Sequence, residues 1–232
     1  MSSNASRNAG LPVAANFGFQ TIRSRISVVN LRDCRLGGTE MARSKEFDPE
    51  RALDKAMHLF WRSGYENTSL EALMREMGIA RQSLYDTFGD KRNLYLKALA
   101  HYRDQTNGQM QKMLREIPSI KDGFAKLLYG MAAETREQHE RGCLLLSANL
   151  QRDIKDAVMR DFLRDNQVRV EAIFVEALKQ AQKRGELPVK ENPDALARFF
   201  VVTIQGMRAM ARLKSDRRAL EQVAQVALAV FK

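Results

Sequence analysis

The chain has 232 residues, of which 44% are hydrophobic and 28% are charged, so it can bury a core in one or two domains. It contains no run of about 18 apolar residues and only two cysteines, which excludes a membrane span and a disulfide framework and favours the cytoplasm. The net charge of +10 favours nucleic acid or an acidic surface as a partner, but residues 41–95 carry nine basic and nine acidic residues, so charge alone does not locate the site.

Residues 1–40 are unlike the rest, because Asn, Ser, Gly and Arg dominate their first half and no helical period runs through them. Three interpretations stay open for this segment. It is a disordered leader, a targeting sequence with five arginines and few acids, or a stretch before a true translation start at Met41. The third follows from Gly37-Gly38, whose codons can form a ribosome-binding sequence just ahead of Met41.

A short polar arm with Arg43 and Lys45 leads into the first predicted helix. Asp48 is a favourable N-cap, and Pro49 suits the first helical position because the N–H that proline lacks has no helical partner there. Gly64 ends this helix. Its apolar face, at helical spacing, consists of Leu53, Ala56, Met57, Phe60 and Trp61.

A helix-turn-helix pattern follows between residues 68 and 91. Thr68 and Glu71 fit a capping box at the start of one short helix, and Gly78 can take the positive φ that a tight turn requires. Asp90 then caps a third helix. Two helices joined by a short turn with glycine are typical of proteins that place the second helix in the DNA major groove. The apolar anchors are Leu70, Leu73, Met74 and Met77 in the first helix and Leu84, Tyr85 and Phe88 in the second.

The remaining chain has helical periodicity with no strand segment and no internal repeat, so the predicted fold class is all-α. Gly, Pro and N-cap residues mark the boundaries between the helices. We expect helices at residues 90–115, 119–140, 143–150, 155–184, 192–214 and 216–231.

Residues 48–100 closely resemble the N-terminal DNA-binding domain of the TetR (tetracycline repressor) family of transcriptional regulators. The pattern Gly-Tyr-x-x-Thr-Ser, then Met-Gly-Ile, then Ser-Leu-Tyr-x-x-Phe-x-x-Lys is specific as a combination. The resemblance implies a helix-turn-helix domain at 41–95 and a helical effector-binding and dimerisation domain at 96–232. The residues that carry it are Phe60, Gly64, Tyr65, Thr68, Ser69, Leu73, Gly78, Ile79, Ser83, Leu84, Tyr85, Phe88, Lys91 and Leu94.

Two features depart from the family pattern. Ala80 precedes the recognition helix where family members often carry Ser, Thr or Asn, which leaves that helix without a side-chain cap at a cost of about 1 kcal/mol. Asp86 and Thr87 stand where a His or Tyr is common. We expect the Asp86 carboxylate to face away from phosphate or to be repelled by it, so this residue is not assigned to DNA.

Arg81 and Gln82 are the best candidates for reading bases, because arginine matches guanine and glutamine matches adenine in bidentate fashion. Lys91 lies at a helix start, which favours an anion, with a solvated lysine as the alternative. The hydroxyl groups of the two short helices either contact phosphate or serve only for capping and packing. The basic arm either contacts DNA or stays solvated. The predicted DNA-binding set is Arg43, Lys45, Thr68, Ser69, Arg81, Gln82, Ser83, Tyr85 and Lys91.

By the same resemblance, the helices at 192–231 form a homodimer interface, and the middle helices enclose a pocket for an unidentified small-molecule effector. A twofold dimer reads a pseudo-palindromic operator in double-stranded DNA, with half-sites about 34 Å apart. Ordinary core packing is the alternative for every pocket candidate. These candidates are Met110, Met113, Phe124, Leu128, Met131, Cys143, Phe162 and Phe174.

Cys143 follows Arg141-Gly142, and this segment resembles a signature of one TetR branch. A thiolate with a lowered pKa can sense oxidants or electrophiles, whereas a buried cysteine is inert. Three scattered histidines support no metal site, and no GxSxG, P-loop or GxGxxG pattern supports catalysis or a cofactor.

The sequence therefore predicts a cytoplasmic, homodimeric repressor that a small molecule releases from its operator, and not an enzyme. Three alternatives remain: an architectural DNA-binding protein without a ligand, a regulator switched by oxidation or alkylation of Cys143, and an enzyme or protein-interaction module that uses the helix-turn-helix only as a scaffold.

Overall fold

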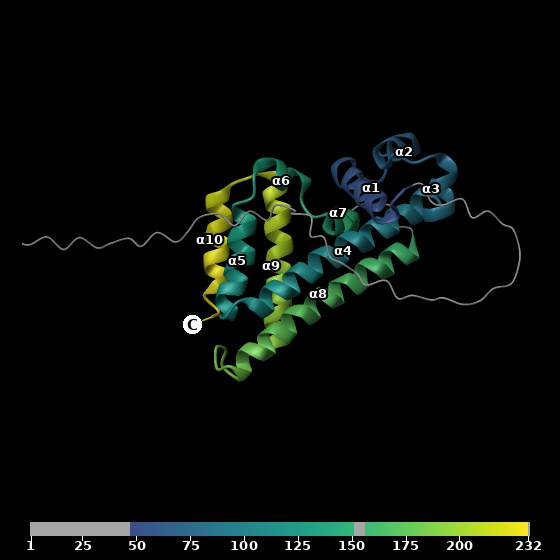
Figure 1. Ribbon diagram of the computed structural model, residues 1–232. Helices are drawn as coiled ribbons and strands as arrows, with labels where there is room; N and C mark the ends of the chain where they lie inside the picture. Colours follow the sequence, from purple (N-terminus) through teal and green to yellow (C-terminus); the bar gives the residue numbers. More distant parts are fainter. Residues whose placement is uncertain (1–46, 151–155, 232) are drawn as a thin grey trace, which may run out of the picture. The chain divides into compact units, whose positions relative to one another are not determined.

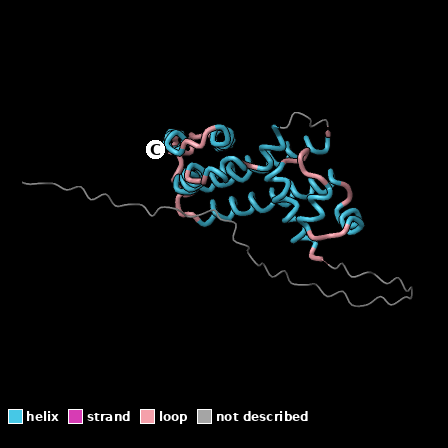
Figure 2. Tube along the Cα trace, turned by 90° about the horizontal axis from the view of Figure 1, so that it is seen from above, coloured by secondary structure: helices cyan, strands magenta, loops and turns pink. Residues whose placement is uncertain are grey.

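The computed structural model describes residues 47–150 and 156–231, which form helices joined by loops, as the trace in Figure 2 shows. These ranges contain no strand, which confirms the predicted all-α class. Among the described helices, none is both long and apolar enough to cross a membrane. Residues 1–40 and the basic residues Arg43 and Lys45 of the arm lie outside the described residues, so the predictions about them stay predictions.

The described helices follow one another as labelled in Figure 1. They are α1 (Pro49–Ser63), α2 (Leu70–Met77), α3 (Arg81–Phe88), α4 (Lys91–Glu116), α5 (Ile120–Ala132), α6 (Arg136–Arg141), α7 (Leu144–Leu150), α8 (Ala157–Lys183), α9 (Pro193–Leu213) and α10 (Arg217–Leu228).

Side-chain caps begin most of these helices. Asp48, Asp90, Asn192 and Asp216 each accept hydrogen bonds from backbone N–H groups in the first turn of α1, α4, α9 and α10. Such caps satisfy N–H groups that have no partner within the helix. These four helix starts agree with the sequence prediction.

Two predicted helix boundaries are wrong. Residues 119–140 do not form one helix, because α5 ends at Ala132 and a capping box formed by Thr135 and Gln138 starts α6. Ser69, rather than Thr68, caps α2, since its hydroxyl oxygen accepts from the Ala72 N–H at 3.1 Å. The first correction concerns where an apolar helix ends, and the second concerns which of two neighbouring hydroxyl residues caps a helix.

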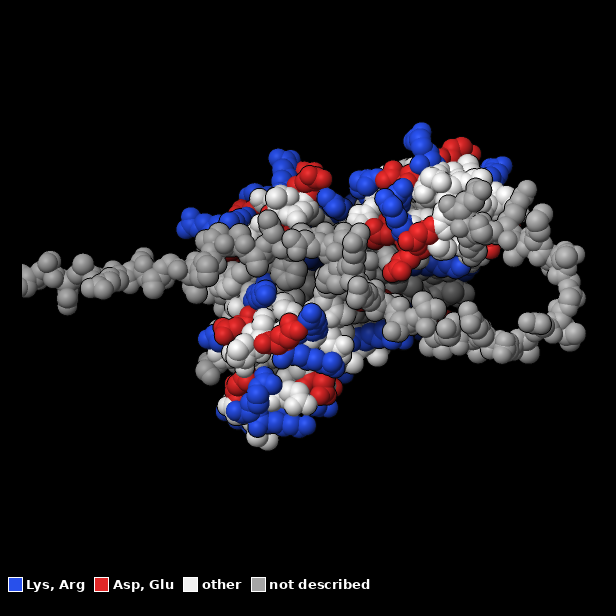
Figure 3. Space-filling model, viewed as in Figure 1, with Lys and Arg blue, Asp and Glu red and all other residues white. Residues whose placement is uncertain are grey.

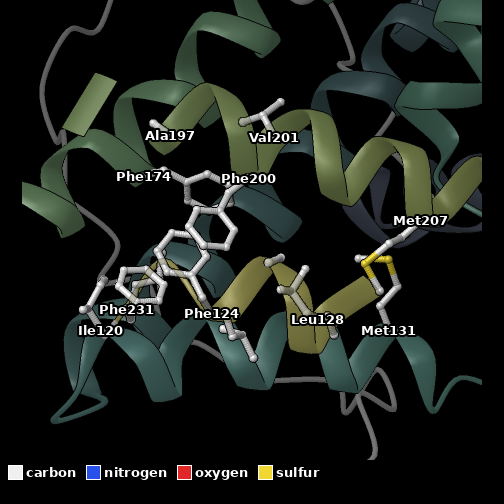
Figure 4. Packing of buried hydrophobic residues seen from close by; sticks show 14 of the residues in the cluster. Ile120, Phe124, Leu128, Met131, Phe174, Ala197, Phe200, Val201, Met207 and Phe231 are labelled. Atoms are coloured by element: carbon white, nitrogen blue, oxygen red, sulfur yellow. The ribbon is translucent and has the colours of Figure 1, made fainter. Parts of the chain in front are cut away.

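Two hydrophobic cores hold the helices together. The N-terminal core is formed by α1, α2, α3, α7 and the first halves of α4 and α8, and the C-terminal core by α5, α9, α10 and the second halves of α4 and α8. In the C-terminal core, Phe124 stacks on Phe200 with ring centroids 3.9 Å apart and on Phe231 at 5.6 Å. Figure 4 shows these rings side by side. Both cores therefore depend on α4 and α8.

Polar side chains of α4 and α8 separate the two cores along these helices. Asn107 on α4 donates to Asn166 on α8 at 3.2 Å, and Gln205 on α9 donates to Gln167 on α8 at 2.8 Å. All four side chains are half-buried, and we call them the amide layer. The amide layer therefore links α4 and α9 to α8 through side-chain hydrogen bonds.

Candidate nucleic-acid interface

The recognition helix α3 packs against the N-terminal core through one face and exposes the other. Leu84 is fully buried and Phe88 is 4% exposed, and residues four positions apart lie on the same side of a helix. A three-residue turn, residues 78–80, precedes α3. Gly78 in this turn has φ 72°, which glycine adopts without steric cost. The exposed side of α3 consists of Arg81, Gln82, Tyr85 and Asp86.

Tyr85 does not anchor α3, contrary to the sequence prediction. Its exposed fraction is 42%, because it lies one position after Leu84 and so points away from the core. Its hydroxyl is therefore accessible to a phosphate, and that predicted role stays a prediction. Ser83, also in the predicted set, is half-buried.

Polar contacts organise the exposed side of α3. Gln82 Nε2 donates to Asp86 Oδ1 at 2.8 Å, and Arg81 Nη2 lies 3.9 Å from Glu71 Oε1 on α2. Ala80 provides no side-chain cap, as its residue type predicts. The Gln82–Asp86 pair was missed from sequence, although a glutamine and an aspartate four residues apart on a helix are a local signal for it.

Charge does not distinguish this part of the molecule. Basic and acidic side chains are interspersed on the face drawn in Figure 3. This agrees with the equal numbers of basic and acidic residues at 41–95. The side chains that α3 exposes, rather than the local charge, therefore mark the candidate DNA interface.

Thr68 is buried, with an exposed fraction of 1%, and its hydroxyl donates to the Gly64 carbonyl oxygen at 2.6 Å. The predicted phosphate contact from this hydroxyl is therefore wrong, because its only proton is used inside the fold. Ser69 is exposed, and capping α2 uses only a lone pair of its oxygen. Its hydroxyl proton can still be donated to a phosphate, so that prediction stands untested.

Lys91 begins α4 beside an aromatic cluster. Its Nζ lies 4.4 Å from the centroid of the Tyr65 ring, and Tyr65 packs against Phe60 and Tyr95. A cation–π contact orients an ammonium group without removing its charge. The half-buried Lys91 therefore offers a positioned positive charge at the N-terminus of a helix.

Arg92 joins α4 to α8 through an ion pair with Asp156. Its Nε and Nη2 donate to the two carboxylate oxygens. The same carboxylate caps α8 by accepting from the N–H groups of Val158 and Met159. The hydrogen bonds from Arg92 are the main reason why the pKa of Asp156 falls from 3.8 to about 2. Helical periodicity carries no information about contacts over such a sequence distance.

Replacing Asp156 by asparagine is expected to destabilise the protein at neutral pH and progressively less in acid. The pKa of Asp156 in the folded chain, about 2, lies below the value of 3.8 that it has when unperturbed, so its stabilisation is present above about pH 4 and disappears as the pH falls towards 2. Urea unfolding of wild type and Asp156→Asn at several values between about pH 6 and 3 measures this difference. A difference that does not change with pH would contradict an ionic origin.

Cys143, immediately before α7, is half-buried and free. Burial, followed by the nearby Cys143 thiol, raises the pKa of Tyr102 well above its usual value. The guanidinium of Arg208 on α9, which pairs with Glu134 at 2.7 Å, acts in the opposite direction and lowers the pKa of Tyr102. Sequence reasoning missed both Tyr102 and Arg208, because they come from helices far apart along the chain.

The segment before α7 also contacts α1. Trp61 Nε1 donates to the Gly142 carbonyl oxygen at 3.0 Å. The Arg141 guanidinium lies 5.2 Å from the centroid of the Trp61 ring and forms an ion pair with Glu137. Residues 141–143 therefore link the helix-turn-helix to the helices that follow it.

The predicted effector residues do not converge on one place. Five of them, Met113, Phe124, Leu128, Met131 and Phe174, are buried in the C-terminal core, and Met110 packs against it. Cys143 and Phe162 pack against the N-terminal core instead. The eight candidates thus divide between the two cores, and ligand binding by any one of them stays a prediction.

Two family models match this chain, one in its N-terminal part and one in its C-terminal part. The family model described as "Bacterial regulatory proteins, tetR family" matches residues 52–98. The model described as "Tetracyclin repressor-like, C-terminal domain" matches residues 125–227. The two matches together include every helix from α1 to α10 at least in part.

Whole-chain relatives agree with these matches. The chain is 30% identical to the uncharacterised HTH-type transcriptional regulator YezE of Bacillus subtilis (strain 168), over 82% of this chain and 100% of the relative. It is 32% identical to the HTH-type transcriptional repressor ComR of Escherichia coli (strain K12), over 82% of this chain and 91% of the relative.

A solved structure extends the likeness to three dimensions. A cysteine mutant of the TetR family transcriptional regulator CifR, complexed with 26-base-pair double-strand operator DNA, has a TM-score of 0.72 and 32% sequence identity, over 82% of this chain and 100% of that one. A TetR family regulator from Cytophaga hutchinsonii has a TM-score of 0.70 at 15% identity, which supports the fold alone. This chain therefore belongs to the TetR family of transcriptional regulators.

Proposed function

We propose that this protein is a homodimeric repressor that binds a pseudo-palindromic operator through α3 and is released from it by a small-molecule effector. The exposed side of α3 carries the proposal. Its arginine and glutamine offer the donors and acceptors that read base edges, while Leu84 and Phe88 fix the helix on the core. CifR, a relative with 32% identity, has been solved on operator DNA.

Within this interface, the residues divide into two roles. Arg81 and Gln82 read bases from the first turn of α3. Ser69, Tyr85 and Lys91 contact phosphates, which fixes the register of the protein on the duplex without reading sequence. Thr68 is excluded from this set because its hydroxyl is buried and hydrogen-bonded.

Dimerisation is supported by an apolar surface on α9 and α10, which pack against each other. In the described chain Val202 is 67% exposed and Val226 is 74% exposed. Contiguous exposed apolar side chains on two packed helices mark an interaction site. We call this surface the apolar stripe: Phe199, Val202, Met210 and Leu213 on α9 with Val223 and Val226 on α10.

Effector control is supported by the position of α4, which contributes to both hydrophobic cores. Its first half lies in the N-terminal core with α1 and α3, and its last turns lie in the C-terminal core. An effector that reaches the amide layer and replaces the Asn107–Asn166 pair would alter how α4 packs on α8. A difference in effector affinity of a few kcal/mol between two arrangements is enough to shift the population away from the DNA-binding form.

A switch at Cys143 is a second candidate. Its thiol contacts Tyr102 on α4 and lies near Arg208 on α9, so an adduct on the sulfur would push apart helices from both cores. Treatment with iodoacetamide should then reduce operator affinity in wild type and not in Cys143→Ser. Equal affinity before and after complete alkylation would exclude this switch.

The first test is DNA binding to the intergenic region beside the gene, titrated over salt. Arg81→Ala/Gln82→Ala should lose about tenfold or more in specific affinity, because one bidentate base contact contributes about 1–3 kcal/mol. Arg164→Ala, which removes an exposed positive charge from α8, serves as the control and should retain the sequence preference. If selection from random DNA gives no preferred sequence for wild type, the proposal fails.

A further inference from the structure

Asp86 is an unexpected residue for a surface that meets DNA. It lies on the exposed side of α3, where a carboxylate is repelled by phosphates. In the structure its Oδ1 accepts a hydrogen bond from Nε2 of Gln82, one helical turn earlier, at 2.8 Å. The Asp86 carboxylate is therefore hydrogen-bonded to a residue that we propose to read bases.

This hydrogen bond decides which way the Gln82 amide faces. An amide can turn by 180° and exchange its nitrogen and oxygen, but a carboxylate accepts only and so selects the nitrogen. The amide nitrogen has two hydrogens, of which Asp86 uses one. When Asp86 accepts the hydrogen that points away from Oε1, the second hydrogen and Oε1 of Gln82 are left as an adjacent donor and acceptor.

The remaining donor and acceptor of the Gln82 amide are complementary to the major-groove edge of one base. Adenine presents an acceptor, N7, beside a donor, the N6 amino group, in the major groove, and glutamine pairs with both at once. Guanine presents two acceptors, N7 and O6, which this edge of Gln82 cannot satisfy.

We propose that Asp86 is a positioning residue that holds the Gln82 amide in the orientation that reads adenine. This inference rests on the proposed function, because it requires that α3 enters the major groove. In water the exposed pair is weak, but contact with DNA excludes water and strengthens the hydrogen bond. The repulsion between Asp86 and phosphates lowers affinity for every sequence alike, so base preference separates the two effects.

Binding-site selection from a random duplex library tests this with wild type, Gln82→Ala, Asp86→Ala and Asp86→Glu. Wild type should select adenine at one position of each half-site, and Gln82→Ala should lose that preference. Asp86→Ala should reduce the preference at the same position about tenfold, which corresponds to one bidentate contact. Asp86→Glu keeps an acceptor-only carboxylate and should retain most of it.

Glu66→Ala is the control for charge, since it removes one exposed acid from the loop between α1 and α2. It should raise affinity for all sequences and leave the selected motif unchanged. Thermal unfolding of each variant checks that α3 remains folded. A role limited to helix stability would lower the melting temperature of Asp86→Ala and leave its motif intact.

Three outcomes would overturn the inference. Asp86→Ala could keep the wild-type adenine preference, or it could instead lose a cytosine at another position, which means that Asp86 reads cytosine directly. Gln82→Ala could also leave the adenine unchanged. If wild type selects no motif, the proposed function itself fails, and this result is distinct from a motif that does not depend on Asp86.

Discussion

Replacing Val202 and Val226 by aspartate is expected to convert the proposed dimer to a monomer. Both side chains are mostly exposed in the described chain and belong to the apolar stripe. In a dimer formed through this stripe, each aspartate would lose its water without gaining a cation, which costs several kcal/mol per buried charge. The dissociation constant should therefore rise by roughly three orders of magnitude, since each 1.4 kcal/mol is a factor of ten.

Sedimentation equilibrium of wild type and Val202→Asp/Val226→Asp over a range of concentrations measures this change. Val168→Asp is the matched control, because Val168 on α8 is 60% exposed and lies outside the stripe. It should leave the dimer unchanged, and circular dichroism should show that all three proteins are helical. A double variant that remains dimeric would place the interface elsewhere.

The same variant tests how the protein reads its operator. A monomer can occupy only one half-site, so it should lose most of its affinity for a full pseudo-palindrome while keeping its affinity for a half-site. Variants of α3 should lose affinity for both. This contrast separates a defect in dimerisation from a defect in base recognition.

Local signals predicted most of the fold. Helix ends depend on residues within one turn, so Asp48, Asp90 and Asn192 could be assigned as caps from their immediate neighbours. The split between α5 and α6 was also local, because Thr135 and Gln138 have capping-box spacing. It was missed because the apolar period before it was extended too far.

The choice between Thr68 and Ser69 needed tertiary information. Either hydroxyl can cap α2, and only the burial of Thr68 against the Gly64 carbonyl oxygen decides between them. The exposure of Tyr85 has the same origin, because an aromatic residue next to Leu84 fits either side of α3 until the core is known. Side-chain direction on a short helix was thus the least predictable part of the site.

Contacts between distant helices could not be predicted at all. Arg92 and Asp156, like Asn107 and Asn166, come from positions on α4 and α8 that no periodicity relates. The apolar effector candidates divide between the two cores for a similar reason. Burial predicted from hydrophobicity cannot distinguish the lining of a pocket from a packed core.

Phe124→Ala is expected to destabilise the protein by about 3–5 kcal/mol, the usual cost of removing a buried phenylalanine and leaving a cavity. Phe124 is fully buried and contacts the rings of Phe174, Phe200 and Phe231. Figure 4 shows it at the centre of this group. Urea unfolding at one fixed protein concentration measures the loss, because the proposed dimerisation would make stability depend on concentration.

Tyr129→Ala provides the control on the same helix, since Tyr129 is 40% exposed and should change stability by about 1 kcal/mol or less. A large loss for Phe124→Ala alone would assign this residue to the core and remove it from the effector candidates. A loss as small as that of Tyr129→Ala would mean that the Phe124 ring contributes little packing. In that case the Phe124 side chain on α5 could move to admit a ligand, and Phe124 would remain a candidate for effector binding.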